Sequence, residues 1–177
     1  MVDAFTDLRE NCLLLIVCSE ALSRKTKGSK DKGLERQRSD TMTNTGGCLC
    51  GQVRYEAMTA PLVSGVCHCK NCQKQAGTAF STLAAFQKAD VDFVGELKLY
   101  QDSDTDTGNT VNRYFCGQCG SPIYSEVPAQ PGMAFIKAGT LDDTDDFVAM
   151  FHCWSSKKQN WVELSPDVPA FPENPQM

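Results

Sequence analysis

The sequence lacks a hydrophobic run long enough to cross a membrane. Residues 13–17, Leu-Leu-Leu-Ile-Val, form a short apolar stretch, whereas a membrane-spanning helix needs about 20 such residues. The start of the chain also lacks the positively charged segment, the longer apolar stretch and the small-residue cleavage site of a secretory signal. We therefore expect a cytoplasmic protein that makes no use of a membrane.

An excess of basic residues is also missing. The 177 residues include 17 lysines and arginines against 22 aspartates and glutamates, so the formal net charge is −5, and nucleic acid is not an expected partner. Residues 24–38 are an exception, with many basic side chains and almost nothing to bury. This composition predicts disorder; a solvated linker suits it better than a nuclear-import or nucleic-acid patch.

Helical periodicity is scarce after residue 43, and short alternating segments predict a mainly β domain. The predicted strands cover residues 52–56, 61–67, 80–86, 97–101, 111–115, 123–127, 134–138 and 147–153. One short helix is expected over residues 70–76, ended by Gly77. Two acidic segments, residues 102–109 and 142–146, are expected to be solvated turns, because neither follows the pattern of a calcium-binding loop. The proline-rich end should cross the surface, with Trp161 and Phe171 as anchors.

Cysteine, in contrast, is abundant. The chain has ten cysteines, which could in principle form five disulfides if the protein were secreted. The tight spacing of seven of them, in a chain without a secretory start, favours metal binding in a reducing compartment. Cys12 and Cys18 lie outside these motifs and are expected to take no part.

The seven cysteines form three chelating motifs: Cys48-x-Cys50, Cys67-x-Cys69-x-x-Cys72 and Cys116-x-x-Cys119-Gly120. Zinc takes four ligands at about 2.3 Å, which places neighbouring sulfurs about 3.8 Å apart in a tetrahedron. In extended backbone, the two sulfurs of a Cys-x-Cys pair can point to the same side. In the third motif, Gly120 can adopt the left-handed conformation just after the second ligand.

Counting the sulfurs suggests two kinds of zinc site. Two pairs can close one site, whereas the triple leaves one position free for water or substrate. We therefore predict two Zn²⁺ per chain, a structural zinc on the two pairs and a catalytic zinc on the triple. The predicted ligands are Cys48, Cys50, Cys116 and Cys119 for the first, and Cys67, Cys69 and Cys72 for the second. Spacing alone also permits a pair to share an ion with two members of the triple.

Several neighbours of the triple have open roles. Lys70 and Lys74 could meet the carboxylates of a ligand or could be solvated helix lysines, which is the preferred interpretation. His68 could be a proton shuttle, although strand alternation turns it away from the metal. Cys153 could be a small buried side chain or a fourth ligand, and the same doubt applies to His152.

Several runs in this order and spacing resemble the family of glutathione-dependent formaldehyde-activating enzymes, which includes the centromere protein V type of domain. The matching runs are residues 46–51 (GGCLCG), 67–77 (CHCKNCQKQAG), 114–124 (YFCGQCGSPIY) and 137–143 (KAGTLDD), with Val53, Tyr55, Trp161 and residues 169–173. The likeness covers about residues 43–174, the expected zinc-binding catalytic domain, and leaves residues 1–42 as an N-terminal extension.

The resemblance implies an Mss4-like β-tent, in which small antiparallel sheets are held by a structural zinc and a second zinc lies near the substrate. It assigns the two pairs and the triple to these two ions, as the counting does. It also implies a carbon-sulfur lyase that joins glutathione and formaldehyde to give S-hydroxymethylglutathione.

The chemistry of the triple agrees with an enzyme acting on a small thiol or thiol adduct. A zinc with three thiolates and an open position can lower the pKa of an incoming thiol or polarise an aldehyde oxygen. The alternative is a binding module, in which both ions brace the β scaffold and the surface recruits a protein partner. The substrate-binding residues and the oligomeric state do not follow from the sequence.

Overall fold

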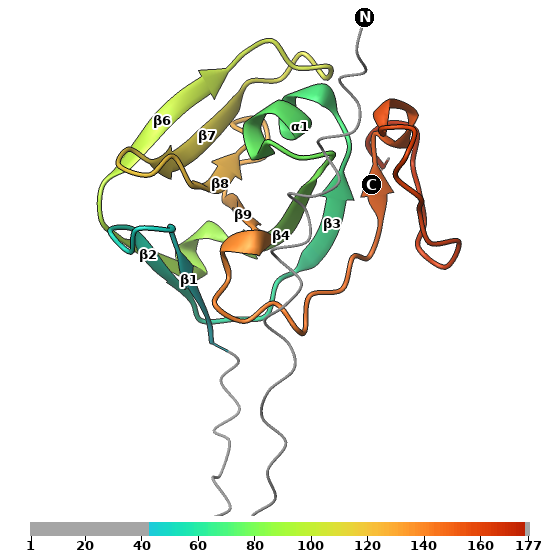
Figure 1. Ribbon diagram of the computed structural model, residues 1–177. Helices are drawn as coiled ribbons and strands as arrows, with labels where there is room; N and C mark the ends of the chain where they lie inside the picture. The colour runs from blue at the N-terminus through green and yellow to red at the C-terminus, as the bar shows by residue number, and fades with distance from the viewer. Residues whose placement is uncertain (1–42, 176–177) are drawn as a thin grey trace, which may run out of the picture. The chain divides into compact units, whose positions relative to one another are not determined.

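The computed structural model describes residues 43–175, which fold into two β-sheets and one short α-helix (Figure 1). The predictions made for residues 1–42 fall outside the described residues. The strands are β1 (Asn44–Gly47), β2 (Arg54–Ala57), β3 (Val63–Cys67), β4 (Ser81–Gln87), β5 (Val91–Val94), β6 (Leu97–Asp102), β7 (Val111–Cys116), β8 (Pro122–Glu126), β9 (Met133–Lys137) and β10 (His152–Cys153). The helix is α1 (Lys70–Ala76), and three 3₁₀ turns are η2 (Lys88–Asp90), η3 (Ala138–Thr140) and η4 (Ser155–Lys157).

The smaller sheet has three antiparallel strands in the order β1-β2-β5. Strand β2 alternates, with Tyr55 and Ala57 buried and Arg54 and Glu56 exposed. Strands β1 and β5 were not predicted from the sequence. Strand β1 reads Asn-Thr-Gly-Gly, a composition with low strand propensity, so its pairing with β2 decides its conformation.

The larger sheet has seven strands in the order β10-β3-β4-β9-β8-β7-β6. All its neighbours pair antiparallel except β10, which runs parallel to β3 and places Cys153 opposite Cys67. The prediction of a mainly β fold with antiparallel sheets and one short helix is confirmed. The strand predicted over residues 147–153 was too long, because only its last two residues pair.

The main core lies where the two sheets meet and includes Val53, Phe86, Ile123 and Ile136, all fully buried. Stacked aromatic rings extend this core, with centroids 4.4 Å apart for Phe93 and Tyr124 and 4.3 Å apart for Tyr114 and Tyr124. Cys48 and Cys116 belong to the same core cluster. The packing that stabilises the sheets therefore also fixes two of the predicted metal ligands.

Helix α1 begins and ends where its sequence predicts. The side chain of Cys69 caps the N-terminus by accepting a hydrogen bond from the amide of Cys72 at 3.3 Å. Gly77 ends the helix in the left-handed conformation, with φ of 65°. At only seven residues the helix is too short to be stable alone, so its position depends on contacts with the rest of the domain.

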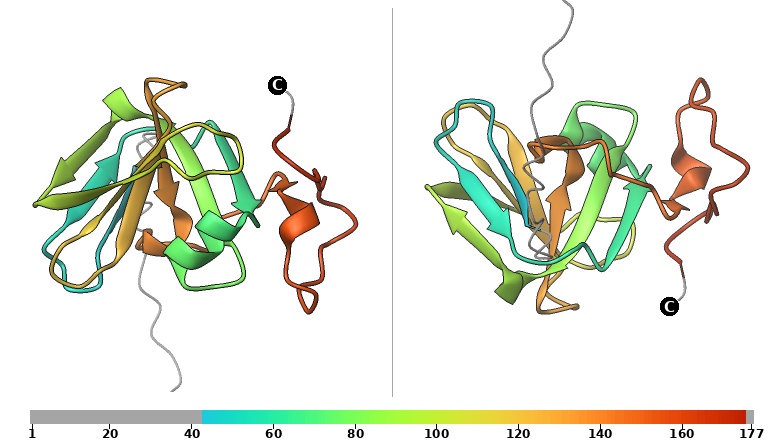
Figure 2. Two further views of the ribbon diagram at one scale, coloured as in Figure 1. Left: turned by 90° about the horizontal axis from the view of Figure 1, so that it is seen from above. Right: turned by 90° about the horizontal axis from the view of Figure 1, so that it is seen from below.

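The C-terminal segment, residues 154–175, follows β10 and lies beside the β3 edge of the larger sheet in both views of Figure 2. It is held by backbone hydrogen bonds from His152 to Pro169 at 2.8 Å and from Phe171 to His152 at 2.8 Å. The indole of Trp154 donates to Asn174 at 2.8 Å. Trp161 was expected to anchor this segment, but it is 72% exposed, because its indole bonds only to Gln159 in the same loop. Trp154, which the sequence analysis passed over, is buried instead.

Candidate metal centres

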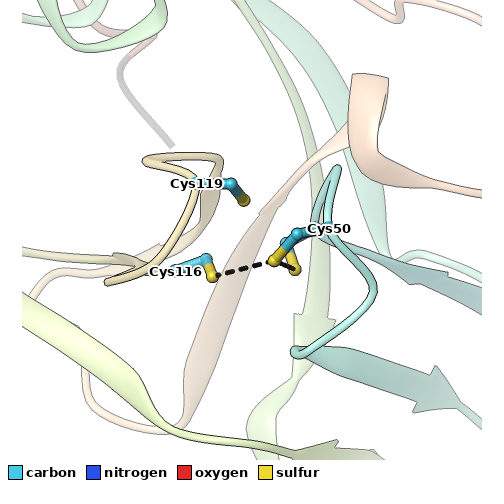
Figure 3. A group of neighbouring side chains, drawn as sticks. Cys50, Cys116 and Cys119 are labelled. Atoms are coloured by element: carbon cyan, nitrogen blue, oxygen red, sulfur yellow. Dashed lines mark hydrogen bonds between the residues drawn. The ribbon is translucent and has the colours of Figure 1, made fainter.

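The first cluster consists of four cysteine sulfurs that lie within 4.8 Å of one another, from Cys48, Cys50, Cys116 and Cys119. The Sγ atoms of Cys48 and Cys50 are 3.4 Å apart, and those of Cys50 and Cys116 are 3.7 Å apart. Figure 3 shows Cys50, Cys116 and Cys119 directed toward a common centre. A disulfide would need about 2.05 Å, whereas a tetrahedral zinc site needs about 3.8 Å, so the spacing suits a metal.

Tight turns bring these four sulfurs together. After β7, the amide of Gly120 donates to the carbonyl of Cys116 at 2.9 Å, and Gly120 has a φ of 75°, as predicted. After β1, the amide of Gly51 donates to the carbonyl of Cys48 at 3.1 Å. Cys48 and Cys50 therefore lie around a turn, and the expectation that an extended backbone would bring their side chains together was wrong.

Neutral donors surround the first cluster. The amide of Val53 donates to the sulfur of Cys48 at 3.2 Å. The hydroxyl of Ser121 lies 3.2 Å from the sulfur of Cys119, and this contact lowers the pKa of the Cys119 thiol to about 5. Hydrogen bonds of this kind stabilise thiolates, which are the form that binds a metal.

The second cluster consists of Cys67, Cys69 and Cys72, whose sulfurs also lie within 4.8 Å of one another. Cys67 ends β3, Cys69 caps helix α1, and Cys72 lies in its first turn. The strand end and the helix start thus form one chelating unit. Cys67 and Cys72 are buried, and Cys69 is partly exposed.

The three thiols of the second cluster compete for ionisation. Hydrogen bonds from Cys67 and Cys69, with the positive charges of Lys137 and Arg113, hold the pKa of Cys72 well below its usual value. Contacts with Cys153, Cys69 and Cys72 raise the pKa of Cys67. One thiolate therefore forms at the expense of its neighbours, and a bound dication is what would allow all three to lose their protons.

The residues predicted to surround the triple have different positions. His68 is fully buried, with its Nε2 3.0 Å from Nδ1 of His152. Burial lowers the pKa of both histidines. Cys153 packs against the cluster, but its sulfur is not among the three that lie within 4.8 Å of one another. Lys70 is exposed and donates to Gln73 at 3.2 Å.

Lys74 lines an open cavity of about 350 Å³ formed by α1, β6 and β7. The other lining residues are Asn71, Gln75, Tyr100, Asp102, Asp104 and Arg113.

Two side chains that the sequence analysis missed fix helix α1. The amide of Asn71 donates to the carboxylate of Asp102 at 2.9 and 3.0 Å and to the carbonyl of Asp104 at 2.7 Å. The amide of Gln73 donates to the carbonyls of His68 at 2.6 Å and Lys157 at 2.9 Å. Because Cys72 lies between them, these contacts on both sides of the helix determine where its sulfur lies.

Two buried cations that the sequence analysis also missed lie near the second cluster. Arg113 forms an ion pair with Asp102, at 2.6 Å from Nη2 and 2.8 Å from Nε. Lys137 is 5% exposed, and its Nζ donates to the hydroxyl of Ser81 at 3.3 Å. Asp102, expected in a solvated turn, is 4% exposed. A lysine at an inward position of an apolar strand, as in Met-Ala-Phe-Ile-Lys, is the sequence signal for such a buried charge.

The donor sets of both clusters fit a soft divalent metal, since every ligand atom is a cysteine sulfur. All eight cysteines in the described part of the chain are free thiols. The structure groups the sulfurs as the counting did, whereas the structural and catalytic roles remain predictions. Among residues 43–175, no helix is long and apolar enough to span a membrane.

Known proteins resemble this chain to different degrees. Among solved structures, a crystal structure of a Rhodobacter sphaeroides protein, a structural genomics target, is 22% identical to the chain, with a TM-score of 0.46. That match covers 58% of this chain and 91% of the other. No curated protein matches the sequence. Residues 43–157, more than half of the chain, match the family model described as glutathione-dependent formaldehyde-activating enzyme. The chain therefore belongs to this family, as the resemblance of its cysteine motifs indicates.

Proposed function

We propose that the protein is a zinc-dependent carbon-sulfur lyase that forms or cleaves a thiol-aldehyde adduct, such as S-hydroxymethylglutathione from glutathione and formaldehyde. The observation that carries this proposal is the second cluster, in which the sulfurs of Cys67, Cys69 and Cys72 lie within 4.8 Å of one another and Cys153 is not part of that group. Family membership supports the substrate class. Free thiols at all eight described cysteines support a reducing compartment, for which we propose the cytoplasm.

The two clusters would then have different roles. Cys48, Cys50, Cys116 and Cys119 would hold a structural Zn²⁺, because four thiolates leave no open position. This ion would tie the turn after β1 to the turn after β7 and so join the two sheets. Cys67, Cys69 and Cys72 would hold a catalytic Zn²⁺. A zinc with an open position supplies a site where a thiol loses its proton or an aldehyde oxygen is polarised.

The proposed reaction needs no oxidant or reductant. In the forward direction the thiol sulfur attacks the carbonyl carbon, a carbon-sulfur bond forms, and the π electrons of the carbonyl move to oxygen. The proton released by the thiol ends on that oxygen. The reverse reaction breaks the carbon-sulfur bond and returns the proton to sulfur. For this chemistry, the helix contacts of Asn71 and Gln73 hold the sulfur of Cys72 in place.

The direct test combines metal content with catalysis. The wild-type protein should contain two Zn²⁺ per chain, and Cys69→Ser should contain one and remain folded. Exchange NMR of glutathione mixed with formaldehyde should show faster adduct formation and cleavage with wild type than with Cys69→Ser. Cys153→Ser, which changes a buried cysteine outside the triple, should retain both ions.

Two results would refute the proposal. The first is wild-type protein that carries two zinc ions and accelerates no thiol-aldehyde exchange. The second is a Cys69→Ser variant that loses its fold together with both ions. Either result would indicate that the second ion braces the scaffold, as expected of a binding module.

A further inference from the structure

The two clusters differ in the charge that surrounds them. Near the first cluster, the cations are exposed: the Arg54 side chain is 46% exposed and paired with Asp142, and the Lys98 side chain is 56% exposed and paired with Glu96. Near the second cluster, Lys137 and Arg113 are both about 95% buried. Burying a charge is costly unless a partner compensates it. Arg113 has Asp102 as its partner, whereas the Lys137 ammonium donates to the neutral hydroxyl of Ser81 and forms no ion pair within residues 43–175.

The strand register shows what Lys137 faces. Cys67 on β3 is opposite Ser81 on β4, and Leu83 on β4 is opposite Lys137 on β9. Cys67, Ser81, Leu83 and Lys137 therefore share one face of the larger sheet. Leu83 packs against Cys67 and Cys72, and Ser81 accepts the hydrogen bond from Lys137. The buried ammonium thus lies next to the sulfurs of the second cluster.

We propose that Lys137 is a positioning residue whose ammonium compensates the thiolate charge of the second cluster, so that the site can accept a fourth, anionic sulfur ligand. This inference rests on the proposed lyase function. A dication held by three thiolates has a net charge of about −1, which opposes the approach of another thiolate. One neighbouring ammonium cancels that charge. Arg113 also lies near Cys72, but its positive charge is shared with its ion-pair partner Asp102.

The thiolates in turn explain how a lysine can be buried here. Opposite charges on one buried face of the sheet attract each other strongly, because little solvent screens them. The ammonium and the thiolates therefore stabilise each other. Within residues 43–175, the buried cations are Arg113 and Lys137, both near the second cluster, which agrees with a first site that takes no further ligand.

The test compares the metal affinity of wild type with that of Lys137→Gln and Lys137→Met. Glutamine can still donate to Ser81 but has no charge, so it separates the charge from the hydrogen bond. Competition with a chromophoric chelator should show that both variants bind the weaker of the two zinc ions about 10–100-fold less tightly, the range found for groups that support metal ligands. Lys88→Met removes one half-exposed positive charge and is the matched control, with no expected change.

Two further measurements assign the effect to the second cluster. In a Cys69→Ser background, Lys137→Gln should leave the affinity for the remaining zinc unchanged. In cobalt-loaded protein, titration with 2-mercaptoethanol followed by the sulfur-to-cobalt charge-transfer band should show about 10–100-fold weaker thiol binding for Lys137→Gln. Wild-type affinities in Lys137→Gln would overturn the inference. Loss of both zinc ions would also overturn it, because Lys137 would then support the fold. Neither result depends on catalysis, which the Cys69→Ser experiment judges separately.

Discussion

The ion pair of Asp102 and Arg113 allows a quantitative test of the structure. Asp102 accepts from Nη2 of Arg113 at 2.6 Å, from Nε of Arg113 at 2.8 Å and from the Asn71 amide at 2.9 and 3.0 Å. The side chains of the pair are 5% and 6% exposed, so solvent screens them little. We expect Asp102→Asn to destabilise the domain, because it leaves the buried guanidinium uncompensated and turns an amide donor toward other donors.

The expected loss of unfolding free energy differs between a buried ion pair, as the structure has it, and the solvated turn that the sequence predicted. Removing one partner of a buried ion pair costs about 3–5 kcal/mol. An asparagine still offers one acceptor oxygen to Arg113, so we expect about 3 kcal/mol, the lower end of that range. A solvated turn would instead predict a change within about 0.5 kcal/mol. Asp104→Asn is the matched control, because its side chain is exposed and only its backbone carbonyl accepts from Asn71.

Urea unfolding at a fixed free zinc concentration measures both variants, since bound metal adds to the apparent stability. A double variant, Asp102→Asn with Arg113→Met, should regain part of the loss, because it removes the unpaired charge as well. If Asp102→Asn and Asp104→Asn unfolded at the same urea concentration, the burial of this ion pair and its role in fixing α1 would be wrong.

Three other predictions concern the turns, a surface ion pair and the metals. Gly120→Ala should lower the free energy of unfolding, measured with urea, by about 1–2 kcal/mol, because Gly120 has a φ of 75° that alanine adopts only with strain. No atom lies near the position of an added Cβ, so a clash adds nothing to this loss. Gly139→Ala, where the space is also open but φ is not positive, should lower the free energy of unfolding less. Arg54, with the Thr45 hydroxyl, holds the pKa of Asp142 at about 2, so this pair should stabilise the fold above pH 4 and lose its effect as the pH falls through about 2; Arg54→Met should raise the Asp142 pKa, measured by NMR, toward its ordinary value, and an unchanged pKa would contradict the pairing. A chelator should remove one zinc ion from the wild-type protein before the other, with Cys69→Ser showing only the slower phase; removal of both ions at one rate would count against an open and a closed site.

The features that could be predicted from the sequence depend on local chemistry. Helix α1 follows from a capping side chain at Cys69 and the left-handed Gly77, both within nine residues. The turn at Gly120 follows from the cysteine spacing in the same way. The four-sulfur group joins segments almost 70 residues apart; the four ligands that a zinc ion needs favoured it, although the spacing also permitted a pair to share an ion with two members of the triple. In each case the information that determines the local structure lies in a short stretch of sequence or in the number of ligands that the ion takes.

The features that could not be predicted depend on which strands become neighbours. Tyr100 on β6 is opposite Arg113 on β7. Asp102, two residues further along β6, therefore lies diagonally across from Arg113 on the same face of the sheet and can pair with it. The same acidic segment is exposed two residues later, at Asp104, so composition alone cannot separate the buried aspartate from the solvated ones. Strand β1 has little intrinsic preference for a sheet and is fixed by pairing with β2.

The strand order also explains how one small domain can hold two different sulfur clusters. The first cluster lies between two turns whose backbone amides and hydroxyl are neutral donors, and its neighbouring cation, Arg54, is half-exposed and paired with Asp142. The second lies at the end of β3, where β4 and β9 bring Ser81 and then Lys137 across the sheet. A shift of β9 by one residue would turn Lys137 to the other face and leave the three thiolates without their buried cation. The pairing of β4 with β9 is therefore as important to the proposed reactivity as the cysteines themselves.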